Sequence, residues 1–411
     1  MTISRRSLIG TATAVAVAET LPRVPARAAT PSLTIGVCSD FSGPYQDVGG
    51  NTSVACVDQA IAEFTASHPG MSVQVLKGDH QNKPDVGAEI ARRWFDQSVD
   101  LLIDVPNSAV ALAIAGVAKD KDKVFINSNA ATSELTNKFC NADTIHWTYD
   151  TYMLAHSTGG AMVKSGGKKW FFITADYAFG HLLRDQTEAV VKAAGGTVVG
   201  DVDYPFPSTT DFSSYLVQAQ SSGADVLGLA NAGKDTVNSI KQAHQFGLTK
   251  TGIKLAGLLI FLNDVNGIGL DIAQGLILTE SFYWNMNDNT RAFTKRVLPR
   301  TPNNYPSMGH AGCYSGTLHF LKAVNEMGIA NAKKSGAGIV EQMKKMPTDD
   351  DAFGKRSIRV DGRFMCPAFL FQVKKPGESK IPWDYYNLLA TTPAEEAFMP
   401  LSEETCALIK A

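Results

Sequence analysis

Short apolar runs alternate with amphipathic segments through the first 150 residues. In the segment that begins at Pro84, apolar side chains recur every four residues at Val86, Ile90 and Trp94, which is helical spacing, and a proline at the first turn is tolerated. The intervening runs have the length and composition of buried strands: LTIGVC, VQVLKGD, LLIDV and VFINS. This βα alternation predicts a parallel sheet with helices on both faces.

The same alternation restarts after Asp150. Its predicted strands are WFFITAD, GTVVGDVDYPF, ADVLGLA and IKLAGLLIF. Two helices are then predicted at residues 307–328 and 336–346, followed by three strands in an antiparallel arrangement: SIRV, AFLFQVKK and DYYNLLATT. We therefore expect an α/β protein with two doubly wound parallel-sheet lobes. The chain would cross between the lobes near Asp150, Glu280 and Pro347, forming a hinge, with a cleft at the carboxyl ends of the two sheets.

The first 28 residues have the pattern of an export signal. Arg5 and Arg6 precede an apolar stretch of residues 7–18, which is too short to span a bilayer, and cleavage is expected after Ala28. The arginine pair resembles a twin-arginine signal, with Sec export as the alternative. We expect an exported, soluble protein of the periplasm. Its expected divisions are 1–28 as signal, 29–150 plus 281–346 as lobe 1, and 151–280 plus 347–411 as lobe 2.

The charge and the motifs argue against several classes of protein. The formal net charge is −2 for the whole chain, and removal of a leader that carries a net charge of +3 would leave about −5, which disfavours nucleic-acid binding. Neither HExxH nor GxSxG occurs, and the eight histidines are scattered. We expect no enzymatic activity, no metal and no cofactor.

Six cysteines in an exported protein invite a search for disulfides. Cys140 and Cys406 lie in polar, loop-like settings, the second close to a chain end that a bridge would fix in place, so they form the candidate pair. The others lie among apolar or small residues, where a free buried thiol is the commoner state: Cys38, Cys56, Cys313 and Cys366.

Two glycine-containing loops resemble phosphate-binding loops. DFSGPYQDVGG, residues 40–50, lacks GxGxxG, and its carboxylates Asp40 and Asp47 would repel a phosphate. GLANAGK, residues 228–234, fits GxxxxGK, but Asp235 follows where a nucleotide loop needs a hydroxyl. Neither loop is expected to bind a nucleotide.

Five segments resemble, in order and spacing, the type I periplasmic solute-binding proteins of the branched-chain amino acid (Leu/Ile/Val-binding) group of ABC importers. They are IGVCSDFSGPYQDVGG, GDHQNKPDVGAEIARRW, DVPNSAVALA, SNAATSELT and ADYAFGHLLRDQTEAVVKAAGGTVVG. The resemblance covers almost all of the chain after the leader. It implies a monomeric binding protein that closes over a small solute and delivers it to an inner-membrane permease with its ATPase subunits.

The resemblance also implies a set of ligand-binding residues. From the first lobe these are the rim residues Tyr45 and Val48, then Asn107 and Ser108 after the third strand, and Ala130, Ala131 and Thr132 after the fourth. Thr132 could instead cap the helix at Glu134. The second lobe would contribute Tyr177, Phe179, Asn231, Leu259 and Tyr283, although Tyr283 could instead pack at the hinge.

One departure from the family pattern changes the expected ligand. Amino acid binders of this group fix the ligand's ammonium with a second-lobe glutamate, whereas the matching stretch here, residues 257–261, is apolar. An unpaired ammonium buried there would cost several kcal/mol. We therefore expect a carboxylate or amide on an apolar or aromatic body, a class that includes relatives of amino acids. A ligand-sensing receptor domain and, more remotely, a secreted α/β hydrolase are the alternatives.

Overall fold

The computed structural model describes residues 32–301 and 304–409, so the expected export signal lies outside the described part. The first lobe is built on a five-stranded, all-parallel sheet in the order β2-β1-β3-β4-β5. Its strands are β1 (Leu33–Ser39), β2 (Val73–Asp79), β3 (Leu101–Asp104), β4 (Val124–Asn127) and β5 (Thr144–His146). All four residues of β3 are buried, as expected for a central strand that is covered on both faces.

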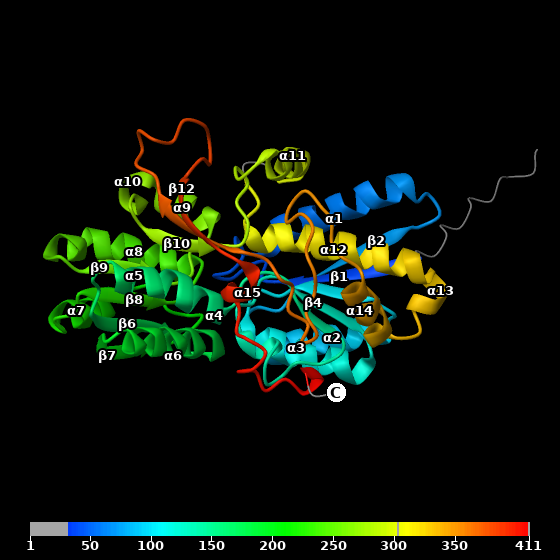
Figure 1. Ribbon diagram of the computed structural model, residues 1–411, viewed down its shortest axis with the longest axis horizontal. Helices are drawn as coiled ribbons and strands as arrows, with labels where there is room; N and C mark the ends of the chain where they lie inside the picture. The colour runs from blue at the N-terminus through cyan, green and yellow to red at the C-terminus, as the bar shows by residue number, and fades with distance from the viewer. Residues whose placement is uncertain (1–31, 302–303, 410–411) are drawn as a thin grey trace, which may run out of the picture.

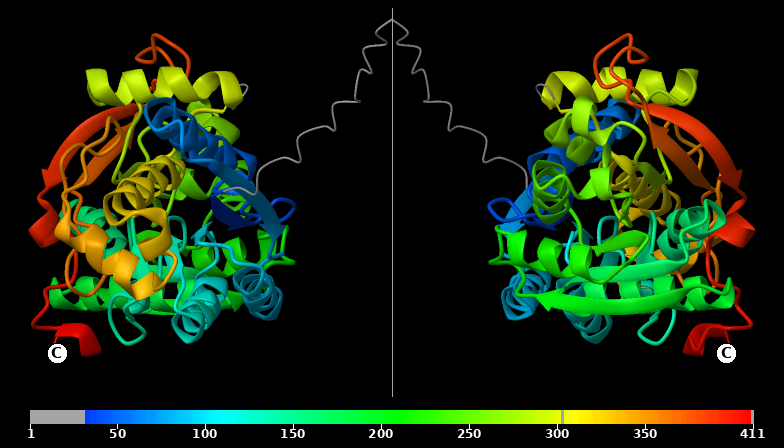
Figure 2. Two further views of the ribbon diagram at one scale, coloured as in Figure 1. Left: turned by 90° about the vertical axis from the view of Figure 1, so that its right-hand side faces the viewer. Right: turned by 90° about the vertical axis from the view of Figure 1, so that its left-hand side faces the viewer.

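Helices cover both faces of this sheet. Leu101 and Ile103 pack into the core beneath α1 and α12, whereas Leu102 packs with α2 and α3, as the alternation of strand side chains requires. Figure 2 shows α1 (blue) and α12 (yellow) on one face of the sheet and α2 and α3 (light blue to cyan) on the other. The helices of the lobe are α1 (Gly50–Ser67), α2 (Pro84–Asp96), α3 (Ser108–Lys121), η1 (Ser133–Leu135), α11 (Asp288–Val297), η4 (Leu298–Arg300), α12 (Met308–Met327), α13 (Ile329–Ala332) and α14 (Gly336–Lys345).

The second lobe lies beside the first, at the left of Figure 1, and has a four-stranded parallel sheet in the order β7-β6-β8-β9. Its strands are β6 (Lys169–Ala175), β7 (Thr197–Tyr204), β8 (Val226–Ala230) and β9 (Lys254–Gly257). Its helices are α4 (Thr151–Leu154), η2 (Ala155–Gly159), α5 (Gly160–Lys164), α6 (Ala178–Ala193), α7 (Ser213–Ser221), α8 (Lys234–Gln245), η3 (Leu248–Thr251), α9 (Leu262–Ile268) and α10 (Leu270–Ala273). The two parallel sheets confirm the expected fold class.

A third, antiparallel sheet joins distant parts of the chain in the order β10-β11-β12. Its strands are β10 (Ile277–Glu280), β11 (Ala368–Val373) and β12 (Tyr386–Thr392). Two sequence expectations need correction. Residues 357–360, SIRV, form only a single bridge from Ile358 to Phe364, and the apolar run 253–261 leaves the strand after Gly257. The short helices α15 (Ala394–Ala397) and η5 (Ala407–Ile409) follow.

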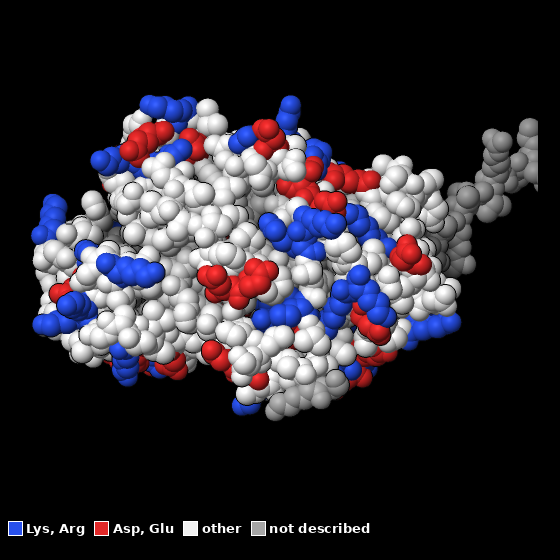
Figure 3. Space-filling model, viewed as in Figure 1, with Lys and Arg blue, Asp and Glu red and all other residues white. Residues whose placement is uncertain are grey.

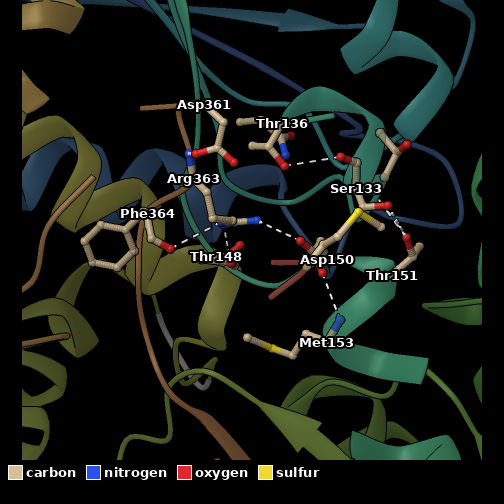
Figure 4. Close-up of polar contacts among 12 residues, drawn as sticks. Ser133, Thr136, Thr148, Asp150, Thr151, Met153, Asp361, Arg363 and Phe364 are labelled. Carbon is tan, nitrogen blue, oxygen red and sulfur yellow. Dashed lines mark hydrogen bonds and ion pairs between the residues drawn. The ribbon is translucent and has the colours of Figure 1, made fainter. Parts of the chain in front are cut away.

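A buried ion pair lies where the chain first crosses between the lobes. Asp150 accepts a hydrogen bond from the backbone N–H of Met153 (2.9 Å), which caps α4. Its Oδ2 lies 3.4 Å from Nη1 of Arg363, a fully buried residue whose guanidinium also donates to the Thr148 carbonyl, as Figure 4 shows. The pair therefore joins the first crossing to the segment that precedes β11.

The C-terminal part of the chain does not divide at residue 347. The N–H of Phe364 donates to the carbonyl of His146 (3.0 Å), so residues near 364 continue the first-lobe sheet beyond β5. After β12 the tail returns to the first lobe, where Cys406 forms a disulfide with Cys140 at a Cα–Cα distance of 5.6 Å. The expected assignment of all of residues 347–411 to the second lobe therefore does not match these contacts. The contacts join residues more than 200 positions apart, so no local sequence pattern indicates them.

Charged side chains are mixed over the face drawn in Figure 3, where Lys and Arg intersperse with Asp and Glu and no large area has one sign. Within residues 32–301 and 304–409, no helix has both the length and the apolar character that a membrane crossing requires.

Candidate functional site

A cleft lies between the carboxyl ends of the two parallel sheets. Its walls approach closely and enclose a cavity of about 10 Å³, roughly what one water molecule needs. Both lobes contribute side chains: Tyr45, Val48, Pro106, Ser108, Asn129, Ala131 and Tyr149 from the first lobe or its edge, and Tyr177, Phe179, Ala232, Leu259 and Phe261 from the second. Seven of the twelve residues expected from sequence thus come together here.

The loop after β1 is folded around one carboxylate. Asp40 accepts hydrogen bonds from the backbone N–H groups of Gly43 (2.6 Å) and Tyr45 (2.8 Å) and from the side chain of Asn82 (2.7 Å). A Cβ at Gly43 would lie 2.6 Å from the Asp40 carboxylate, so this tight turn requires glycine. The turn directs Tyr45, only 2% exposed, into the cleft.

The lobes touch through two aromatic hydroxyls. Tyr45 Oη and Tyr177 Oη are 2.7 Å apart, and the ring of Phe206 stacks on both tyrosines, at centroid distances of 5.2 and 4.5 Å. Because the tyrosines come from different lobes, this contact depends on how far the cleft is closed.

The GLANAGK loop makes a further contact between the lobes. Lys234 N–H donates to the carbonyl of Pro44 (3.1 Å) across the cleft. Gly233 has a φ of +59°, and a Cβ there would lie 2.7 Å from that carbonyl, so the glycine serves a close approach of two backbones. This loop therefore has a role in lobe contact that involves no phosphate.

Several expected ligand residues are engaged in local hydrogen bonds. Asn107 caps α3 by accepting from the N–H of Val110 (3.1 Å), and Thr132 Oγ1 accepts from the N–H of Glu134 (3.3 Å), which is the capping alternative. The N–H and carbonyl of Ala130 bond to the side chain of Asn127. These three residues lie beside the cleft and are absent from its lining.

Two further expected residues are absent from the cleft lining and are engaged elsewhere. Asn231 bonds to Ser239 (3.2 Å) and Thr236 (2.7 Å) at the start of α8. The hydroxyl of Tyr283 donates to Asp384 (3.2 Å) beside the third sheet, which is the hinge-packing alternative.

Sequence reasoning did not select Pro106, Asn129 or Tyr149, although all three line the cleft. The hydroxyl of Tyr149 donates to the carbonyl of Asn129, and its ring meets Phe261 edge-on at 5.6 Å. Tyr149 directly precedes the crossing at Asp150, so its position adjoining the expected hinge is the signal that could have found it.

The geometry is that of two lobes with a narrow cleft between the carboxyl ends of their sheets, and comparison with known proteins identifies the family. A family model described as a periplasmic binding protein matches residues 32–378. The chain belongs to the periplasmic binding protein family.

Solved structures extend this result. A periplasmic binding protein from Burkholderia mallei is 47% identical and superposes with a TM-score of 0.87, covering 92% of this chain and 98% of that one. A branched chain amino acid ABC transporter periplasmic ligand-binding protein from Burkholderia xenovorans is 38% identical, with a TM-score of 0.79 and coverage of 92% and 100%. An ABC transporter solute binding protein from R. palustris in complex with 4-hydroxybenzoate is 21% identical, with a TM-score of 0.78 and coverage of 88% and 97%.

In this binding protein the carboxylates lie behind the cleft lining. Asp104 is fully buried behind Asn129, whose side-chain amide donates to it, and burial raises its pKa to about 6, against the opposing effect of polar groups on Ser39 and Asn129. Asp235 accepts from the hydroxyl of Tyr204 (2.7 Å), and burial raises its pKa to about 7. None of the twelve lining residues is Asp, Glu, Lys, Arg or His.

One group of metal-capable side chains lies outside the cleft lining. Asp176, His181 and Asp203 could direct ligand atoms to a common point. They already pair with neighbours: His181 contacts Asp176 at 2.9 Å, and Arg184 contacts Asp203 at 3.3 Å. Exposed groups that satisfy one another in this way do not by themselves indicate a metal site.

Proposed function

We propose that this binding protein is the solute-binding component of an ABC importer and that its ligand is a small organic acid or amide with an apolar or aromatic body. The observation that carries the proposal is the cleft lining, which has five aromatic side chains and no ionisable Asp, Glu, Lys, Arg or His. Aromatic walls favour a flat or apolar body, because they offer area for stacking and burial.

Neutral groups would hold the carboxylate. Ser108 lines the cleft at the first turn of α3, where backbone N–H groups point out of the helix and the helix dipole favours an anion. Its hydroxyl accepts a hydrogen bond from the N–H of Thr132 (3.2 Å) and keeps a proton to donate. Charge-assisted hydrogen bonds of this kind need no buried counter-charge. An ammonium group would find no carboxylate among the lining residues, so a free α-amino acid would pay an uncompensated desolvation cost.

The likeness to the R. palustris protein supports only the fold at 21% identity, yet it provides an example in which the fold is found with an aromatic hydroxy acid. The 38% identical relative from Burkholderia xenovorans carries the name of a branched chain amino acid transporter component. One relative is thus an example with an acid that has no amino group, and the other is named for amino acid transport, so both ligand classes have to be tested.

Calorimetry with matched ligand pairs tests the proposal. Leucine is compared with 4-methyl-2-oxopentanoate, and phenylalanine with 3-phenylpropanoate, because each pair differs chiefly in the ammonium group. We expect the deaminated member to bind at least tenfold tighter, since an unpaired buried polar group costs about 1 to 3 kcal/mol or more. If leucine or phenylalanine binds tighter, the ligand class is wrong, although the role in solute binding would stand.

Two finer points belong to the same proposal. We expect an exported periplasmic monomer, delivered through a leader, that docks on a permease with its ATPase subunits. A receptor domain of the same fold would bind the same ligands, so transport is tested separately. Uptake of the radiolabelled acid should be lost when the gene is deleted and restored by the intact gene. Uptake that is unchanged by the deletion would favour the sensing alternative.

A further inference from the structure

A second pocket lies at the hinge, away from the cleft. It has a volume of about 180 Å³ and lies between the start of α11, the hairpin of residues 348–356 and the beginning of β11. Ser281 in its wall directly follows the last residue of β10, and Pro367 directly precedes β11. The pocket is therefore bordered by two of the crossings between the lobes.

One wall carries a cation without a counter-ion. The backbone of Arg356 pairs with Thr348 in the hairpin, with its carbonyl accepting at 2.8 Å, so the side chain is free for another role. The Nε of Arg356 is buried and makes no hydrogen bond. Within residues 32–301 and 304–409, no carboxylate forms an ion pair with its guanidinium. A buried, unpaired donor of this kind is costly and calls for an acceptor.

The acidic side chain in the same lining already has an ion-pair partner, which it shares with a second carboxylate. Asp351 lies 2.9 Å from Nη2 of Arg296, which also contacts Glu63 at 2.6 Å. Arg356 is therefore the charged side chain of the lining for which no ion pair is found among the described residues. Ser281 in the same wall is 2% exposed, and its hydroxyl lies beside the thiol of Cys366.

The rest of the pocket suits an apolar body. Phe282 and Phe353 lie at a ring-centroid distance of 6.0 Å, and Phe369 adds a third aromatic wall. We infer that this hinge pocket is a second binding site, which takes a small organic monocarboxylate whose anionic head pairs with Arg356 and whose apolar body packs on the phenylalanines.

Occupancy of this site bears on lobe closure. The pocket has its present shape only while the crossings at 281–283 and 367–369 keep their present conformations. A molecule that fills it adds contacts in that arrangement of the lobes, in which the cleft is narrow, and thereby favours it.

Fluorine NMR with 4-fluorobenzoate tests the inference on the whole protein. A bound resonance is expected that is lost in Arg356→Met, with binding at this site at least tenfold weaker, because a charge-assisted pair disappears. The matched control is Lys355→Met. Lys355 is the neighbouring residue, is exposed and lies outside the pocket lining, so loss of its positive charge should leave that resonance unchanged.

The test keeps the two sites apart. A bound resonance that remains in Arg356→Met comes from ligand in the cleft. If no such resonance remains, the result counts against the proposed function but not against the hinge site. Should Arg356→Met fold poorly by circular dichroism, Arg356→Lys takes its place and is expected to shift and weaken the hinge resonance. If every bound resonance is unchanged in the folded variant, or if Lys355→Met abolishes the same resonance, the inference is overturned.

Discussion

The hydroxyl contact between Tyr45 and Tyr177 allows the coupling between cleft closure and ligand binding to be measured. Tyr177→Phe removes one hydroxyl and keeps the ring that stacks on Phe206. Tyr45 is 2% exposed, so its hydroxyl would stay buried without its partner, at a cost of about 1 to 3 kcal/mol. Because the contact joins the two lobes, the cost falls on the closed arrangement and should weaken ligand binding by about 5- to 150-fold.

The double variant Tyr45→Phe with Tyr177→Phe supplies the decisive comparison. Replacing both partners by apolar groups of the same shape is often nearly neutral, so affinity should largely recover and the coupling energy should be well above zero. Calorimetry with the tightest acid gives the affinities, and small-angle scattering reports compaction on binding. Tyr385→Phe is the control, since its hydroxyl bonds to Asn266 (2.9 Å) outside the cleft.

Additive losses in the two single variants would refute this reasoning, because they would mean that the hydroxyls do not depend on one another when ligand binds. Single variants that bind as tightly as the unmodified protein would refute it as well. That result would indicate that the ligand separates Tyr45 from Tyr177 in the bound state.

Two further predictions concern buried charges. Arg363→Met should lower the free energy of unfolding in urea by about 3 to 5 kcal/mol, because Asp150 would stay buried without its counter-ion, and a loss below about 1 kcal/mol would contradict this. The pKa of Asp104 is raised from 3.8 to about 6, so the native state keeps a proton that the unfolded state releases, and stability falls as pH rises from about 4 to 6. Asp104→Asn removes this titration, so the free energy of unfolding of the variant relative to that of the unmodified protein should rise by about 3 kcal/mol from pH 4 to pH 7, measured by urea titration. Parallel pH profiles of the two proteins would show that this carboxyl does not titrate in that range.

Hydrophobic periodicity predicted the two parallel sheets because their central strands are buried on both faces and therefore have continuous apolar runs. It failed where an apolar run has a different cause. Residues 258–261 continue the run of β9, but Leu259 and Phe261 line the cleft instead of a sheet. The third sheet was only partly predictable, because β10 has four residues and pairs with β11, a strand about 90 positions later in the chain.

The candidate site was harder to predict for a related reason. A serine, threonine or asparagine before a helix is equally typical of a cap and of an anion site, and only the hydrogen bonds of Asn107 and Thr132 separate the two roles. Tyr149 and Asn129 reach the cleft through a turn whose course depends on packing at the first crossing. No periodicity in the sequence records that packing.

Charge is distributed in this molecule according to what has to stay fixed and what has to open. The fully buried Arg363 joins Asp150 to the segment before β11, and such a pair has a strict geometry because neither charge tolerates burial alone. The cleft lining has no such pair, and hydrogen bonds between the lobes join uncharged groups, as between Tyr45 and Tyr177, between the backbones of Lys234 and Pro44, and between Gln186 and Ser133. Neutral contacts lose little when water replaces them, so the lobes can separate and admit a solute while the ion pair keeps the crossing in place.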